Sequence, residues 1–312
     1  MTLPTLRVVI VAWNAADELP RCLAALAAMR REHFVLEHVI VVDNASLDDS
    51  CGVAQRAGAG LGVNVLSNRE NVGYARAANQ GAAGGSTDYL LFLNPDARVA
   101  PGTLDTLVAH MERPEWARVG ICGPLLEGEG GEVQRECAAF PTPATFLAKS
   151  AGLDVLLSGH VPTLQLEEFD HLTSREVDHV MGSVYLVRGL LFREVGAFDE
   201  RFFVYLEDLD LSLRARQHGY ATRYVAEARA FHRGGKNATT ARPARLAYSL
   251  ESRIRYAFKH FSRGEALAVA AATLGLEPTL RLARGLARGS WLEATTTVRG
   301  YRQAIARLAR PR

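Results

Sequence analysis

The chain has 312 residues, of which 48% are hydrophobic and 22% charged. This balance is ordinary for a globular protein and excludes long disorder, and the length suits one large α/β domain with an appendage or two modest domains. The net charge of +2 hides an asymmetry, because residues 1–241 carry 22 Lys and Arg against 30 Asp and Glu, whereas residues 242–312 carry 14 against 4. A basic tail on an acidic body indicates contact with a polyanion, either a membrane surface or nucleic acid.

The four cysteines are scattered, without a C-x-x-C pair or a histidine ligand pattern nearby. Reduced thiols in the cytoplasm are therefore expected, rather than a zinc site or a disulfide framework, at Cys22, Cys51, Cys122 and Cys137. The longest apolar stretch, residues 266–276, has eleven residues. It is too short to span a bilayer as a helix.

Apolar runs alternate with helical patterns in the first half of the chain, which is typical of an α/β protein with a parallel sheet. Strands are expected at residues 8–11, 39–42, 63–66, 89–93, 118–122 and 180–187. Helices are expected at residues 17–31, after a capping box at 46–49, at 71–84 and after Pro101. Residues 124–180 are less regular, with a glycine-rich hairpin turn at 128–131, and a helical, Arg-rich pattern begins at about residue 245.

Polar side chains recur where four of the predicted strands end. These carboxyl ends carry Asn14, Asp43-Asn44, Asn68 and Asn94-Pro95-Asp96. Ligands bind at this edge of an open α/β sheet, because the loops there converge on one crevice. Turns favour Asn and Asp in any protein, which explains one such end more readily than four in register. The sequence has neither a G-x-G-x-x-G nor a P-loop motif, so dinucleotide-binding enzymes and P-loop hydrolases are disfavoured.

Without such a loop, a divalent cation is expected to neutralise the charge of a diphosphate ligand. Asp96, on a loop stiffened by Pro95, is a suitable hard oxygen ligand for Mg²⁺ or Mn²⁺. His232 is a candidate nitrogen ligand, which suits Mn²⁺ better than Mg²⁺. The alternative is that His232 is a hydrogen-bonding loop residue.

An acidic segment at residues 202–211, FFVYLEDLDL, places three carboxylates within four residues, beside aromatic and aliphatic side chains. Its leucines recur at helical spacing, so it begins a helix with one buried face. An apolar wall weakens the hydration of a carboxylate and raises its proton affinity toward that of a general base. The alternative is a helix N-terminus whose acids suit the helix dipole, with an Asp210–Arg214 pair at i, i+4.

Five motifs in this order resemble the family 2 glycosyltransferases, particularly their bacterial rhamnosyltransferase-like branch. They are VVDNASLDDS at 41–50, NVGYARAANQG at 71–81, LNPD at 93–96, GAFDERFF with EDLDL at 196–211, and HRGG at 232–235. The resemblance covers about residues 6–236. It implies a GT-A fold, in which a Rossmann-like mixed sheet is flanked by helices.

The resemblance also implies a domain organisation. Residues 1–241 would form the catalytic domain, with a nucleotide half at about 1–123 and an acceptor half at about 124–241. Residues 242–312 would form a basic helical C-terminal extension.

By the same resemblance, Asp43 contacts the nucleotide base and Asp96 binds the metal, with His232 as a metal or diphosphate contact. Asp208 is the implied catalytic base, and Glu207 orients the acceptor or Asp208. The predicted donor-binding residues are the strand-end residue Asn14 together with Asp43, Asn71, Asn79 and Asn94.

Two positions depart from the family pattern. Asn94 stands where many members carry an acid, so the ribose contact there would be an amide. The segment Gly234-Gly235-Lys236 lacks the Ser often found after the glycine. Gly182-Ser183 is expected either to leave room for the donor sugar or to allow a strand bend.

The predicted function is a metal-dependent inverting glycosyltransferase. It would move a sugar from a nucleotide-diphosphate sugar, with dTDP-rhamnose or a UDP-sugar as the sharper version, to a hydroxyl of a lipid-linked or polysaccharide acceptor. A single base without a protein nucleophile implies direct displacement. The rivals are a sugar-phosphate nucleotidyltransferase, which would need a Gly-rich basic loop after the first strand, and a non-catalytic nucleotide-sugar or carbohydrate-binding protein.

The basic tail is expected to lie on the inner face of the cell membrane and to make the cytoplasmic enzyme peripheral. Three arginines at 281, 284 and 288 share one side of a helix, beside Leu280, Leu286 and Trp291. Nucleic acid is disfavoured because no recognised motif accompanies the charge. The alternative is a tail that packs on the catalytic domain or on a second subunit of a homodimer.

Overall fold

The computed structural model describes residues 2–153, 164, 166, 169–234 and 242–309. The chain forms two compact units. The first comprises residues 1–138, 165–200 and 208–235, and the second comprises 139–164, 201–207 and 236–312. Two internal segments, 139–164 and 201–207, are thus grouped with the C-terminal helices, and the predicted domain boundary after residue 241 stays a prediction.

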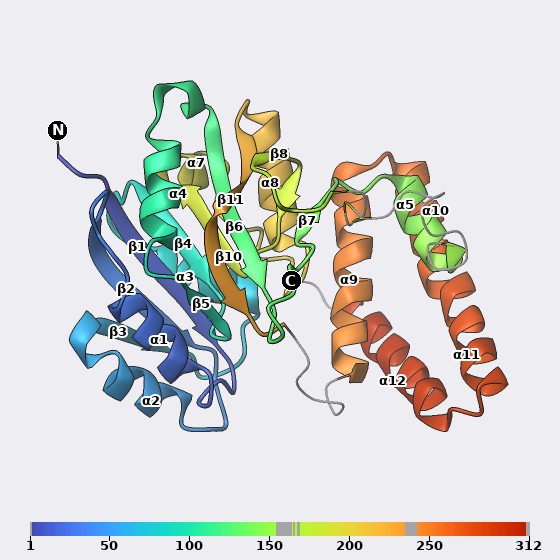
Figure 1. Ribbon diagram of the computed structural model, residues 1–312. Helices are drawn as coiled ribbons and strands as arrows, with labels where there is room; N and C mark the ends of the chain where they lie inside the picture. Colours follow the sequence, from blue (N-terminus) through green and yellow to red (C-terminus); the bar gives the residue numbers. More distant parts are fainter. Residues whose placement is uncertain (1, 154–163, 165, 167–168, 235–241, 310–312) are drawn as a thin grey trace. The chain divides into compact units, whose positions relative to one another are not determined.

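The first unit is built on a mixed sheet that has nine strands in the described residues, in the order β3-β2-β1-β4-β10-β6-β11-β5 with β8 beside β11 (Figure 1). Its strands are β1 (Thr5–Ala12), β2 (Val35–Asp43), β3 (Val63–Ser67), β4 (Tyr89–Leu93), β5 (Ala97–Val99), β6 (Val119–Glu127), β8 (Arg175–Val177), β10 (Val184–Arg188) and β11 (Ala221–His232). A separate pair joins β7 (Cys137–Ala138) to β9 (His179–Val180). The four strands from β3 to β4 are parallel, whereas β10 runs antiparallel to both β4 and β6.

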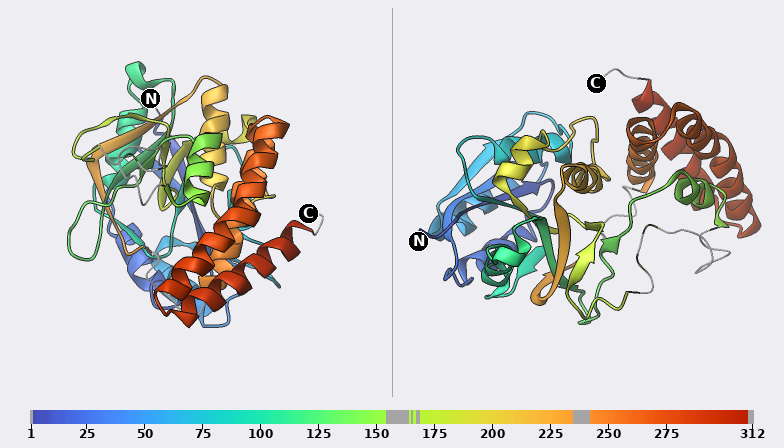
Figure 2. Two further views of the ribbon diagram at one scale, coloured as in Figure 1. Left: turned by 90° about the vertical axis from the view of Figure 1, so that its right-hand side faces the viewer. Right: turned by 90° about the horizontal axis from the view of Figure 1, so that it is seen from above.

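Helices cover both faces of this sheet (Figure 2). They are α1 (Leu19–Ala27), α2 (Ser50–Ala57), α3 (Tyr74–Ala82), α4 (Thr103–Met111), α7 (Gly189–Glu194) and α8 (Glu207–Gln217), with short 3₁₀ turns η1 (Ala59–Leu61) and η2 (Pro114–Trp116). Side chains of β1 alternate between the two cores. Val8 and Ile10 pack with α1 and α4, whereas Val9 and Val11 pack with α3. Burial on both faces explains why β1 is an unbroken apolar run.

Two local predictions are wrong. The capping box at 46–49 does not form, because α2 begins after Asp49, whose side chain makes no capping bond. Instead, the Ser46 hydroxyl accepts from the Asn14 N–H at 2.9 Å, and Asp48 accepts from the Ala16 N–H at 3.0 Å. These side chains join the loops after β1 and β2. The strand expected at 180–187 is split into β9 and β10.

The second unit consists of α5 (Pro143–Ser150), α9 (Arg242–His260), α10 (Arg263–Ala271), a π-helical turn η4 (Ala272–Leu276), α11 (Glu277–Ala287) and α12 (Trp291–Leu308). Within it, α12 packs against α9 and α11 (Figures 1 and 2). Its core contains the rings of Phe146, Tyr256 and Phe261 and a buried Arg253–Glu277 ion pair of 2.5 Å.

The helix formed by residues 263–287 corrects an expectation about the membrane. It continues from α10 through η4 into α11, and by length and composition it is sufficient to cross a bilayer, although 266–276 alone is not. Glu277 lies within it and is paired with Arg253 of α9. The helix therefore contacts α9 through this ion pair, whereas only 22% of its apolar window is buried.

Candidate active site

Asn44 organises the loop that follows β3. Buried at the end of β2, it donates its amide N–H groups to Asn71 Oδ1 at 3.0 Å and to the Gly73 carbonyl at 3.2 Å. Its Oδ1 accepts from Asn68 at 3.2 Å and from the Val72 N–H at 3.0 Å. Asn68 and the end of β2 are thereby brought together as expected from the strand ends, and Asn71 joins them. Asn44 was among the polar strand ends predicted from the sequence but not among the predicted donor-binding residues.

Asp43 presents a buried carboxylate oxygen in the same region. Its Oδ2 is 3.4 Å from the Ser46 N–H, whereas Oδ1 is buried and has no hydrogen-bond partner among the described residues. A buried acceptor without a donor costs roughly 1–3 kcal/mol, which a bound N–H donor would recover. Asn14 lies on the neighbouring loop with a left-handed backbone (φ 52°), and its side-chain oxygen accepts from the Leu47 N–H at 2.7 Å.

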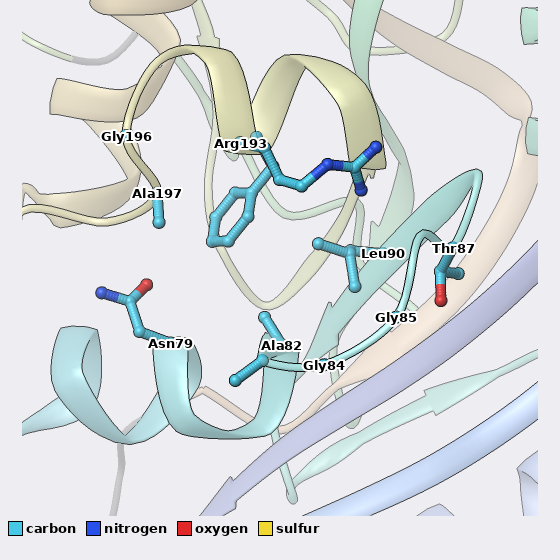
Figure 3. Close-up of a pocket in the computed structure, with 11 residues that line it drawn as sticks. Asn79, Ala82, Gly84, Gly85, Thr87, Leu90, Arg193, Gly196 and Ala197 are labelled. Atoms are coloured by element: carbon cyan, nitrogen blue, oxygen red, sulfur yellow. The ribbon is translucent and has the colours of Figure 1, made fainter.

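Asn79 is not used in this way. Its amide donates to the Phe198 carbonyl at 2.9 Å and accepts from the Phe198 N–H at 3.1 Å. It also lines a pocket of about 340 Å³ formed by the end of α3, the following loop and α7 (Figure 3). That pocket lies beside Thr87 and Leu90 at the amino end of β4, whereas Asn94 follows its carboxyl end. Asn79 thus holds the segment at Phe198 in place, and its predicted contact with the donor stays a prediction.

Antiparallel pairing of β5 with the end of β11 places Asp96 beside His232, because His232 is paired with Ala97. Asp96 Oδ1 lies 3.4 Å from His232 Nε2, and Glu136 Oε1 lies 3.2 Å from His232 Nδ1. Burial alone lowers the pKa of His232, but hydrogen bonds to the two carboxylates outweigh it and raise the pKa to about 9. Glu136 comes from the irregular segment before β7, so no local pattern pointed to it.

Asp208 is the second residue of α8, and three donors surround its carboxylate. The Gly182 N–H donates to Oδ2 at 2.8 Å, the Leu209 N–H donates to Oδ1 at 2.8 Å, and His179 Nε2 is 3.5 Å from Oδ2. Burial by itself raises the pKa of Asp208, but His179 and the two N–H groups outweigh burial and hold the pKa below its usual range. The side chain is 19% exposed, so solvent still reaches it.

A hydroxyl pair holds His179 in place. The ring is buried, with Nδ1 at 2.9 Å from the Ser212 hydroxyl, and that hydroxyl is 2.9 Å from the Tyr185 hydroxyl. His179 belongs to β9 and Ser212 to α8, and neither was predicted from the sequence. A lone buried histidine gives no sequence signal, because its partners are 29 or more residues away and only the fold brings them near.

Gly182 lies in the bend between β9 and β10, beside the Asp208 carboxylate. A Cβ at this position would lie 2.8 Å from Asp208 Oδ2, which is closer than side chains tolerate. Gly182 therefore leaves room for a carboxylate. The two predicted reasons for Gly182 were room for the donor sugar and a bend in the strand.

One polar network connects the Asp208 region with the Asp96 region. Beside Gly182, the Ser183 hydroxyl donates to Glu136 Oε2 at 2.8 Å, and the Ser183 carbonyl accepts from the Asn94 N–H at 2.9 Å. Glu136 in turn contacts His232, which contacts Asp96. The fold thus connects Asp208, Asn94, Asp96 and His232 through hydrogen bonds and ion pairs within the first unit.

The remaining acids of the segment have other surroundings. Asp210 is buried and pairs with Arg214 at 2.8 Å, which confirms that predicted i, i+4 pair. Glu207, the first residue of α8, is buried and belongs to the second unit. All four cysteines are free thiols, and burial raises the pKa of Cys22 and Cys122 to about 12.

Comparison with known proteins identifies the family. The family models described as "Glycosyl transferase family 2" and "Glycosyl transferase family group 2" match residues 7–134 and 89–283. The chain is a family 2 glycosyltransferase. It is 32% identical over 244 residues to the N-acetylglucosaminyl-diphospho-decaprenol L-rhamnosyltransferase of Mycobacterium tuberculosis (strain ATCC 25618 / H37Rv), covering 73% of this chain and 75% of that protein. Rhamnosyltransferase WbbL of Escherichia coli (strain K12) is 28% identical over 170 residues, covering 54% of this chain and 61% of WbbL.

Solved structures of similar shape confirm the GT-A fold predicted for this glycosyltransferase. The mannosyltransferase PcManGT from Pyrobaculum calidifontis, in complex with GDP-Man and Mn²⁺, superposes with a TM-score of 0.58 at 17% identity, covering 99% of this chain and 88% of that one. TarS 1-349 of S. aureus gives a TM-score of 0.54 at 14% identity, covering 98% and 81%. At these identities, the likeness concerns the fold alone.

Proposed function

We propose that this glycosyltransferase moves a sugar from a nucleotide-diphosphate donor to a hydroxyl of a lipid-linked or polysaccharide acceptor. The more specific hypothesis is that this sugar is rhamnose. The rhamnosyltransferase relatives support this choice of sugar. The name of the mycobacterial relative, which refers to a diphospho-decaprenol substrate, supports a lipid-linked acceptor. The orphaned Asp43 oxygen supports recognition of a nucleobase that offers an N–H donor, as thymine and uracil do.

In this mechanism Asp208 is the general base. Its lowered pKa keeps the carboxylate ionised at neutral pH, so it can accept a proton from the acceptor hydroxyl. The expectation that an apolar wall raises its proton affinity is wrong, because His179 and two N–H groups stabilise the ionised form and make Asp208 a weaker base than predicted. As the acceptor oxygen forms its bond to the sugar carbon, the bond from that carbon to the diphosphate oxygen breaks, and the proton passes to Asp208. Attack from the face opposite the leaving group inverts the sugar carbon.

The single observation that carries this proposal is the network from Asp208 through Ser183 and Glu136 to His232 and Asp96. A rigid connection of this kind would hold a proton acceptor and a diphosphate-binding region in constant register. An inverting transfer needs one group at each end of the reacting bonds. A carbohydrate-binding protein has no need of an ionised base in that place.

The test is turnover measured over a panel of sugar nucleotides. Asp208→Asn preserves the shape but removes the proton acceptor, so kcat should fall on the order of 10²–10⁴-fold with little change in donor affinity. Glu115→Gln, an exposed carboxylate on η2, is the matched control and should retain full turnover. An Asp208→Asn variant with wild-type turnover would reject Asp208 as the base and direct attention to Glu207.

We further propose that Asp96 and His232 hold Mg²⁺ or Mn²⁺. A hard carboxylate oxygen and an imidazole nitrogen 3.4 Å apart, with side chains 25% and 13% exposed, fit a shared cation. The cation would displace the proton that the raised pKa of His232 retains at neutral pH. Such a cation would offset the charge of the leaving diphosphate. No group of three or more His, Cys, Asp or Glu suited to a metal occurs among the described residues, so donor oxygens and water would complete the coordination.

Calorimetry tests this metal proposal. Wild-type enzyme should bind the sugar nucleotide more weakly after chelation, and Asp96→Ala should abolish the difference between metal-loaded and chelated protein. Glu115→Gln should behave as wild type. Equal donor affinity with and without chelator in the wild type would remove the metal from the mechanism.

Finally, we propose that the enzyme is cytoplasmic and peripheral to the inner face of the membrane. A lipid-linked acceptor resides in the bilayer, so its transferase must reach the lipid surface. Residues 242–312, with 14 Lys and Arg against 4 acids, suit an anionic leaflet. Flotation with lipid vesicles measures this contact independently of catalysis.

A further inference from the structure

An arginine-lined pocket lies within the second unit, between α9, α11 and α12. It has a volume of about 200 Å³. Arg242 of α9 and Arg281 and Arg284 of α11 supply three guanidinium groups, and Thr296 of α12 supplies a hydroxyl. Glu293 is the one carboxylate among the described lining residues. The pocket therefore concentrates positive charge and hydrogen-bond donors at one point.

The surrounding ion pairs leave the positive charge in excess. Arg281 Nε donates to Glu277 at 2.8 Å, and Glu277 is also neutralised by the buried Arg253. Glu293 lies 4.0 Å from Arg288. Arg242 and Arg284 are exposed, and neither pairs with a carboxylate among the described residues. Guanidinium groups present paired donors that match phosphate oxygens, so a phosphate group suits this pocket.

The rim of the pocket is apolar. Leu292 lines the pocket and is 58% exposed, and the adjacent Trp291 is 76% exposed. Leu286, on the other side of the turn that joins α11 to α12, is 59% exposed. A soluble phosphate would make no use of these side chains. An amphiphile would, since Trp and Leu enter the membrane interface while arginines meet the headgroups.

We infer that this pocket binds the phosphate of an anionic membrane lipid while Leu286, Trp291 and Leu292 enter the interface. This site deepens the proposed membrane contact and rests on it, but it is independent of the proposed chemistry. The proposed site also assigns different roles to different basic residues of the tail. Arg242 and Arg284 bind the headgroup, whereas arginines elsewhere on α12 add only diffuse attraction.

The experiment compares two double variants of the full chain. Arg242→Gln with Arg284→Gln removes two charges from the pocket, and Arg299→Gln with Arg302→Gln removes two exposed charges of α12 outside it. Sedimentation uses vesicles of phosphatidylcholine, alone or with about one third phosphatidylglycerol. The pocket variant should lose at least ~10-fold in affinity for the anionic vesicles, with the control losing much less. Equal losses would overturn the pocket and leave a diffuse basic surface.

Two further arms identify the ligand source and the state of the protein. Trp291 emission should shift to the blue on anionic vesicles, and Trp291→Phe should remove that shift. A second measurement adds inorganic phosphate to the vesicles. If phosphate displaces the protein completely and Trp291 emission does not shift on vesicles, the pocket binds free phosphate and the lipid proposal is rejected. Turnover on a water-soluble acceptor should be unchanged in the pocket variant, so vesicle binding and the glycosyl transfer can fail separately.

Discussion

Replacing His179 tests how the structure tunes the proposed base. His179→Phe keeps a ring in the buried site but removes the Nε2 group 3.5 Å from Asp208 Oδ2. The Gly182 and Leu209 N–H groups remain, each at 2.8 Å. Because one of three donors to the ionised form is lost while burial persists, the pKa of Asp208 should rise.

The structure also sets the size of this change. A hydrogen bond to a charged group contributes about 1.5–3 kcal/mol, and the long 3.5 Å separation argues for the lower end. The pKa of Asp208 should therefore rise, and about 1.4 kcal/mol corresponds to a tenfold change in its ionisation equilibrium. Asp208 must be ionised to accept a proton, so activity is lost as the pH falls through its pKa. The acid limb of kcat/KM should therefore move toward higher pH.

The assay is the pH profile of kcat/KM for wild type, His179→Phe and His179→Gln. The Gln variant retains an N–H donor and should return the acid limb toward the wild-type position, which a merely space-filling role for His179 would not predict. KM for the donor should stay constant. An acid limb that does not move in a folded His179→Phe variant would refute the proposed tuning of Asp208.

Three further predictions concern other contacts. Glu136→Gln removes one of the two carboxylates that raise the pKa of His232 to about 9, so NMR titration of the metal-free protein should show a lower value; an unchanged pKa would show that Asp96 alone is responsible. Gly182→Ala would place a methyl group 2.8 Å from Asp208 Oδ2, and it should reduce turnover strongly while circular dichroism and donor binding stay normal; full turnover would mean that the carboxylate can move without cost. Glu277→Gln leaves Arg253 buried without its charged partner and should destabilise the second unit by about 3–5 kcal/mol, seen as a lower thermal midpoint that the exposed variant Glu265→Gln does not reproduce.

Local pattern was sufficient for much of the first unit. The apolar run of β1 is buried on both faces, and the strand expected at 89–93 is β4. The period of hydrophobic residues reports which face is buried, and that information is contained within a few neighbouring residues. The strand at 180–187 was misjudged because Val180 and Met181 lie only two residues before the apolar run that begins at Val184. The two residues between them, Gly182 and Ser183, form the bend, and a carboxylate from α8 lies beside Gly182.

The sequence by itself determined the alternation of strands and helices, the polar strand ends and the five motifs that place the chain in its family. Only the tertiary structure decided that Glu136 contacts His232 and that His179 contacts Asp208, pairs that are 96 and 29 residues apart. It also decided that Asn79 is bonded to Phe198. Hydrogen bonds across such separations depend on strand order and register, which no local period encodes. The arginine pocket has the same origin, because Arg242 and Arg284 come to line one pocket only when α9 and α11 both pack against α12.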